Sequence, residues 1–138
     1  MLLTRRYRFS ASHRLHSERL SCAENAELYG KCNNPHGHGH NYALEVTVEG
    51  SLNPETGRVL SPGALDRFVR EKVLDFLDHH DLNEDLPEFK ALVPTTENLA
   101  LVIGKRLCAS WGECFARTRL VRVFIEETKR NSFQLELS

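Results

Sequence analysis

The segment from Cys32 to Glu49 constrains the fold more than any other part of the chain. Its first nine residues hold one thiol and three imidazoles, and the remainder alternates apolar and polar side chains. This period of two predicts a half-buried β-strand over about 39–49. Because side chains two apart on a strand share a face, His38 and His40 lie at the start of the apolar face.

A second alternating segment, residues 5–13, carries His13 at the end of its own apolar face. If the two strands are antiparallel neighbours, three imidazoles meet at one end of the sheet. Zinc in catalytic sites takes three protein ligands and keeps a fourth position for water or substrate. The sequence therefore predicts that His13, His38 and His40 hold Zn²⁺, whereas His13 considered alone is typical of a packed core residue.

Cys32 leaves two interpretations of this metal site open. As a fourth ligand, the thiolate would close the metal shell and make the site structural. Held away from the metal, it would be free to act as a base or nucleophile. His36 is a possible competing ligand, but Gly37 leaves its direction undefined, and we interpret it as a polar loop residue.

Two helices are predicted in the middle of the chain. Ser61 and Pro62 are a typical helix start, and apolar residues then recur at intervals of three and four as far as Leu77. The phrase from Pro94 to Asn98 opens a second helix, whose apolar stripe extends to Trp111 and for which Gly112 is a plausible stop.

Two further strands complete the pattern. Residues 119–127 alternate, and a final strand follows a short turn; the residues that share a face are Val121, Val123, Ile125 and Glu127 in the first, and Phe133, Leu135 and Leu137 in the second. The order strand, strand, helix, helix, strand, strand predicts an α+β fold. We expect a four-stranded antiparallel sheet with both helices on one face, and a homo-oligomer could cover its open edges.

Length and charge exclude several classes of protein. The chain has 138 residues, which predicts one domain over 1–138, and its formal net charge is −1 with both signs interspersed. Neither a nucleic-acid partner nor a membrane partner is indicated, and the apolar runs are too short to cross a bilayer. Four cysteines without an apolar leader favour reduced thiols and a cytoplasmic location.

Two acidic positions are candidates for chemistry. Asp78 beside His79 suits a proton-transfer pair, although a solvated helix exit explains the same residues. Glu127 continues an apolar strand face, where a carboxylate costs free energy unless it is paired. It could bind the flat amidine-like edge of a ligand through two parallel hydrogen bonds. A salt bridge to an arginine, or a strand that ends before Glu127, would explain it equally.

Together these residues resemble the 6-pyruvoyl tetrahydropterin synthase family over nearly the whole chain. The combination is far more specific than any of its parts. The matching phrases, in family order, are Phe9-Ser10-Ala11-Ser12-His13-Arg14, Gly30-Lys31-Cys32-Asn33-Asn34-Pro35, Gly37-His38-Gly39-His40-Asn41-Tyr42, Leu77-Asp78-His79, Thr95-Thr96-Glu97-Asn98 and Glu127-Thr128.

The resemblance implies a fold, an assembly and a role for each site residue. The fold is the T-fold, in which the four-stranded sheets of three subunits close a barrel and two trimers form a homohexamer with active sites between subunits. The implied roles are zinc ligation by His13, His38 and His40, catalysis by Cys32, Asp78 and His79, and pterin anchoring by Glu127, with Thr95, Thr96 and Glu97 bordering the pocket.

The resemblance also implies a reaction, in which 7,8-dihydroneopterin triphosphate loses triphosphate and rearranges its side chain, with zinc as the cofactor and no external redox cofactor. The related 6-carboxytetrahydropterin synthases of the queuosine pathway use the same substrate but commonly have a shorter interval between the cysteine and the H-x-H pair. Here five residues separate Cys32 from His38, which favours the pyruvoyl-forming type. This chain has His36 at a position where the pyruvoyl-forming enzymes often have asparagine. A non-catalytic pterin- or zinc-binding module is the alternative from another class.

Overall fold

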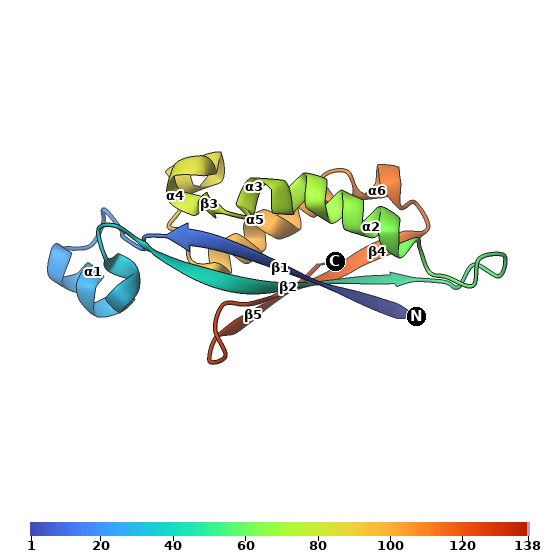
Figure 1. The fold of residues 1–138 in the computed structure, drawn as a ribbon, viewed down its shortest axis with the longest axis horizontal. Coiled ribbons are helices and arrows are strands. Elements are labelled where there is room, and N and C mark those ends of the chain that lie inside the picture. The colour runs from blue at the N-terminus through green and yellow to red at the C-terminus, as the bar shows by residue number, and fades with distance from the viewer. Residues whose placement is uncertain (138) are drawn as a thin grey trace.

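A sheet of five strands forms one layer of the protein in the computed structural model, which describes residues 1–137 (Figure 1). The strand order is β3-β1-β2-β4-β5. The four longer strands pair with one another in antiparallel fashion and are β1 (Leu2–His13), β2 (His38–Gly50), β4 (Thr118–Glu126) and β5 (Ser132–Glu136). All four were predicted. The prediction of a purely antiparallel four-stranded sheet is wrong, because β3 (His80–Asp81) adds a short parallel edge to β1.

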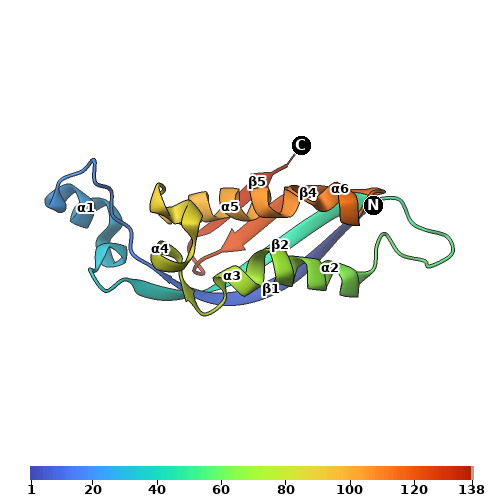
Figure 2. The same cartoon turned by 90° about the horizontal axis from the view of Figure 1, so that it is seen from above.

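The helices that cover the sheet lie on one of its faces, as predicted. Figure 2 shows them as two rows, one over β1 and β2 and the other over β4 and β5. The first row is α2 (Pro62–Val69), a π-helical segment (Arg70–Leu74) and α3 (Asp75–Leu77); the second is α5 (Thr96–Cys108) and α6 (Trp111–Cys114). The predicted stop at Gly112 is wrong, because α5 ends at Cys108 and Gly112 lies inside α6.

Four short elements lie in the connections between the strands and the long helices. The segment after β1 contains α1 (Cys22–Tyr29) and a 3₁₀ turn (Gly30–Asn33), which extend beyond the end of the sheet (Figure 1). After β3 come α4 (Leu82–Asp85) and a second 3₁₀ turn (Pro87–Lys90). Ser21 caps α1 by accepting a hydrogen bond from the Glu24 amide, while the Glu24 carboxylate accepts one from the Ser21 amide.

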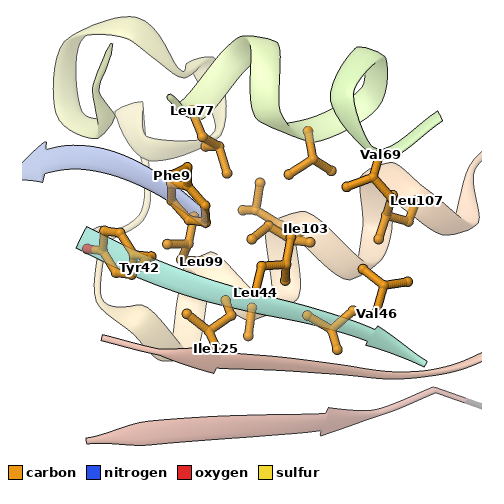
Figure 3. Close-up of a cluster of buried hydrophobic side chains, with 14 of the residues drawn as sticks. Phe9, Tyr42, Leu44, Val46, Val69, Leu77, Leu99, Ile103, Leu107 and Ile125 are labelled. Carbon is orange, nitrogen blue, oxygen red and sulfur yellow. The ribbon is translucent and has the colours of Figure 1, made fainter. Parts of the chain in front are cut away.

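The hydrophobic core fills the space between the sheet and the two rows of helices. Figure 3 shows apolar side chains of β1, β2 and β4 directed toward those of α2 and α5. Leu44, Val46, Leu99, Ile103 and Ile125 are fully buried. The alternation that predicted the strands therefore does separate a core face from an outer face.

One strand departs from strict alternation. In β4 the register shifts where Thr47 and Val48 of β2 meet it, so that Val121 is an extra residue opposite the shift. Such a β-bulge reverses the direction of the side chains on one side of it. Leu120 therefore lies in the core, and the prediction that Val121 shares the core face of Val123 is wrong.

Across residues 1–137, no helix has both the length and the apolar character needed to cross a membrane.

Candidate metal and ligand site

Three imidazoles come together where β1 ends and β2 begins. In the antiparallel register His13 lies opposite His38, and Ala11 lies opposite His40. Because both strands alternate, the three histidine side chains share the face that carries the core. One ligand atom from each of these histidines and one from Cys32 all lie within 4.8 Å of one another. These four residues are the candidate metal ligands of the described chain.

The backbone fixes which nitrogen of His13 faces this cluster. The Nδ1 of His13 lies 2.8 Å from the carbonyl oxygen of Pro94, which can only accept, so Nδ1 carries the proton. The other nitrogen, Nε2, is left with a lone pair and lies 3.1 Å from Nε2 of His40. Two nitrogens bound to one tetrahedral zinc at about 2.0–2.1 Å would lie about 3.3 Å apart. The spacing of the two nitrogens therefore fits a shared metal ion.

Two of the imidazoles, those of His13 and His40, have pKa values that favour the form a metal requires. Burial is the main cause that lowers the pKa of His13, and it also lowers the pKa of His40. A lowered pKa keeps these rings neutral near pH 7, and neutral imidazole is the form that ligates metals. The hydrogen bond from His13 to a backbone carbonyl is a typical outer contact of a metal-bound histidine.

Cys32 is held in place by the chain that follows His13. The Leu15 amide donates to the Cys32 carbonyl at 2.7 Å, and the side-chain amide of Asn33 donates to the Leu15 carbonyl at 2.7 Å. This two-way clamp keeps the half-buried thiol beside the histidines. Burial, and then the charge of Glu127, raise the pKa of Cys32. A bound divalent cation would lower this pKa and so favour the thiolate.

Gly37 brings the two metal-binding segments together. Its φ is +70°, and a Cβ built at this position would lie 2.9 Å from the carbonyl oxygen of His13. Glycine is therefore the residue that lets the start of β2 approach the end of β1 so closely.

Glu127 lies beside the histidines, one residue beyond the end of β4. Its side chain is 13% exposed, and its Oε1 lies 3.8 Å from Nε2 of His40. The other carboxylate oxygen accepts a hydrogen bond from the hydroxyl of Thr96, the first residue of α5. In the described chain the basic side chain within 4 Å of this carboxylate is a histidine and not an arginine. The carboxylate is thus held near the N-terminus of a helix, where negative charge is favoured.

The other two residues predicted to border the pocket have different surroundings. Thr95 caps α5, because its hydroxyl accepts from the Asn98 amide at 3.2 Å. Glu97 is exposed in the first turn of the helix. Of the three, Thr96 is the one that contacts Glu127, and the roles of Thr95 and Glu97 remain predictions.

Asp78 and His79 are not members of the cluster of candidate metal ligands within one chain. Nδ1 of His79 lies 3.1 Å from Oδ1 of Asp78, so the two side chains do contact each other. The Ser10 amide donates to Oδ1 of Asp78, and the His79 amide donates to the Ser10 carbonyl, so both residues are fixed at the edge of β1. His79 is largely exposed and lines a hollow with Ser10, Ser12 and Asn41, whose side chains point to the outer face.

Sequence reasoning missed several residues that build the site. Pro94 acts through its carbonyl oxygen, which any residue would supply, so no side chain marks it. Asn33 belongs to a phrase that was recognised, but its clamp depends on a contact with Leu15. The alternating pattern marked Tyr42 as a core residue and gave no sign that its hydroxyl is directed toward this site.

The fold and the site define an α+β protein with a candidate metal centre of three histidines and a cysteine, next to an anchored carboxylate. The chain belongs to the 6-pyruvoyl tetrahydropterin synthase family, whose sequence model matches residues 2–137.

Individual relatives agree with this assignment. A 6-pyruvoyl tetrahydrobiopterin synthase of Poecilia reticulata is 54% identical over 101 residues, covering 73% of this chain and 69% of the relative. The Dictyostelium discoideum protein of the same name is 44% identical over 133 residues, covering 95% and 92%. The solved structure of Caenorhabditis elegans 6-pyruvoyl tetrahydropterin synthase superimposes with a TM-score of 0.87 at 40% identity, covering 100% of this chain and 96% of that one.

Proposed function

We propose that this protein is a zinc-dependent carbon–oxygen lyase that converts 7,8-dihydroneopterin triphosphate to 6-pyruvoyl tetrahydropterin and triphosphate. The observation that carries this proposal is the convergence of His13, His38, His40 and Cys32 next to Glu127. One cluster of side chains thus combines candidate metal ligands, a thiol and a carboxylate able to bind the edge of a pterin. Membership of the family supports the same reaction.

Zinc is the metal that the donor set favours. Three neutral imidazoles and a nearby thiol suit Zn²⁺, whereas Mg²⁺ and Ca²⁺ prefer oxygen ligands. We assign ligation to His13, His38 and His40. When bound, zinc would supply Lewis-acid polarisation of the substrate side-chain oxygens.

Glu127 is the group that would orient the substrate. The 2-amino and N3 positions of a pterin present two parallel N–H donors, which match the two oxygens of a carboxylate. Thr96 restrains one of those oxygens, and the other faces His40, so a ring bound there projects its side chain toward the metal ligands. Fixing the reacting carbons against Cys32 in this way contributes to catalysis by orientation.

Cys32 and the Asp78–His79 pair would move protons. The thiolate of Cys32, clamped beside the metal ligands, is the base that we assign to the carbon chain of the substrate. Asp78 and His79 lie at the edge of β1, away from this cluster, so we propose that they act in the pocket of a neighbouring subunit. A T-fold homohexamer with active sites between subunits, working in the cytoplasm, would bring the two groups together.

Replacing Glu127 with glutamine should weaken substrate binding and leave the metal in place. The amide keeps one acceptor but replaces the other with a donor, which opposes an N–H of the pterin edge. Loss of a hydrogen bond to a charged group predicts a rise in KM of about 10- to 100-fold. Steady-state kinetics with metal analysis checks this. Glu126→Gln, on the outer face of β4, is the matched control and should behave as the unaltered protein.

Product analysis tests the function itself. The zinc-loaded protein is incubated with 7,8-dihydroneopterin triphosphate, and the products are identified by mass spectrometry. We expect 6-pyruvoyl tetrahydropterin and triphosphate. Acetaldehyde together with 6-carboxytetrahydropterin would instead establish the carboxy-forming reaction, which the interval between Cys32 and His38 disfavours. Unchanged substrate would contradict the enzyme assignment and favour a pterin- or zinc-binding module.

A further inference from the structure

The hydroxyl of Tyr42 is a buried polar group without a partner. Tyr42 is fully buried on β2, and its oxygen makes no hydrogen bond to any of residues 1–137. A buried hydroxyl left unpaired costs about 1–3 kcal/mol relative to one that is hydrogen-bonded. Phenylalanine would fill the same space without this cost. The hydroxyl therefore calls for an explanation other than packing.

The ring of Tyr42 is held so that its oxygen is directed to the ligand site. It stacks on Phe9 with ring centroids 4.8 Å apart and planes 14° apart, and its centroid lies 5.6 Å from that of His40. Figure 3 shows the oxygen at the end of the apolar cluster, directed away from Leu44 and Val46. The hydroxyl thus lies at the boundary between the hydrophobic core and the site.

Ala43 of β2 pairs with Glu126, so Tyr42 lies beside Glu127 across the sheet, and Thr96 is hydrogen-bonded to that carboxylate. Burial, and then the nearby charges of Glu127 and Cys32, raise the pKa of Tyr42, whereas the Thr96 hydroxyl lowers it. A phenol with an ordinary pKa of about 10 is protonated near pH 7 and can donate a hydrogen bond. Because the oxygen is closed off from solvent, a bound ligand does not reach it directly. Any hydrogen bond that it forms must go to a neighbouring side chain.

The hydroxyl of Thr96 can accept the hydrogen bond that the Tyr42 hydroxyl can donate. It has a single proton, which it donates to Glu127, and its own lone pairs can still accept a hydrogen bond. Tyr42 has a free donor in the same buried space. Hydrogen bonds in a chain polarise one another, so a donor behind Thr96 would strengthen the bond from Thr96 to the carboxylate.

We propose that Tyr42 is a positioning residue for Glu127. When the edge of a pterin occupies the carboxylate, the Tyr42 hydroxyl donates to Thr96, which donates to Glu127, and this chain fixes the anchor for the ligand. The inference rests on the pterin-binding function proposed above. It assigns to Tyr42 a hydrogen bond that forms only when the ligand is bound, and that therefore contributes to ligand affinity.

The test compares two removals of a tyrosine hydroxyl from the same sheet face. Tyr42→Phe should weaken binding of neopterin to the zinc-loaded protein about three- to tenfold, measured by fluorescence titration, with an unchanged or raised melting temperature. Tyr7→Phe is the matched control, because Tyr7 donates to Asp66 at 2.8 Å, away from the site. It should lower the melting temperature and leave the affinity for neopterin unchanged.

A double-mutant cycle then tests the route through Thr96. On a Thr96→Val background, Tyr42→Phe should change the affinity less than twofold, because the acceptor is gone. On a Thr96→Ser background, which keeps the hydroxyl, the full effect should return. If Tyr42→Phe weakens binding just as much on the Thr96→Val background, the chain of hydrogen bonds through Thr96 is overturned. It is also overturned if Tyr42→Phe does not change the affinity of the otherwise unaltered protein.

The same titration separates failure of this inference from failure of the proposed function. If the unaltered protein binds neopterin but Tyr42→Phe binds it equally well, the role of Tyr42 is wrong and the pterin function stands. If the unaltered zinc-loaded protein does not bind neopterin, the pterin function is contradicted, and the positioning role is lost with it.

Discussion

Replacing Cys32 with alanine should abolish most turnover and leave the metal bound. We assign Cys32 the role of a base, and removal of a positioned acid–base group typically lowers the rate about 10²- to 10⁴-fold. The three imidazoles do not depend on the thiol for their placement, because His13 is fixed by the Pro94 carbonyl and all three lie on paired strands. Steady-state kinetics and elemental analysis of the purified variant measure the two effects separately.

The outcome for the metal decides which role Cys32 has. Cys22→Ala is the matched control, because Cys22 is an exposed thiol at the start of α1 and should be dispensable for both properties. A Cys32→Ala variant that loses its zinc together with its activity would contradict the catalytic assignment and support a structural four-ligand site. A variant that retains both zinc and activity would exclude either role.

Removal of the metal should abolish turnover without unfolding the subunit. The core between the sheet and the helices consists of apolar side chains that do not contact the candidate ion, and burial of each large one contributes about 1.5–3 kcal/mol. The ligand-bearing ends of β1 and β2 are also paired through their backbones. Dialysis against a chelator, followed by far-ultraviolet circular dichroism and an activity assay, checks both parts.

Metal replacement sharpens this test. Zinc added back to the chelated protein should restore turnover, whereas Mg²⁺ should not, because it prefers oxygen ligands in octahedral geometry. Loss of the helical and strand signal on chelation would show instead that the metal is needed for folding.

Alternation of apolar and polar residues predicted the strands that are long enough to show it. Residues 5–13 and 39–49 alternate over enough positions to fix which side chains face the core, and that face carries all three candidate histidine ligands. The strand β3 has only two residues, and no periodicity can mark so short a segment. The bulge at Val121 is set by pairing with β2 and is equally invisible in a local pattern.

The sequence identified the functional side chains of the site better than the contacts that hold them in place. The metal-ligand cluster and the carboxylate of Glu127 were marked by their residue types in unusual positions. The contacts that hold His13 and Cys32 end on main-chain groups of Pro94 and Leu15, which have no sequence signature. The edge position of Asp78 and His79 also depends on pairing with β1, so sequence order alone did not place them.

We propose that three imidazoles hold a zinc ion whose remaining position is open, with the Cys32 sulfur nearby but not bonded to it. X-ray absorption at the zinc edge of the loaded protein tests this claim most directly, because nitrogen and sulfur ligands lie at different distances. We expect only nitrogen and oxygen neighbours, at about 2.0–2.1 Å. A sulfur neighbour at about 2.3 Å would contradict the claim and make the site a closed structural one.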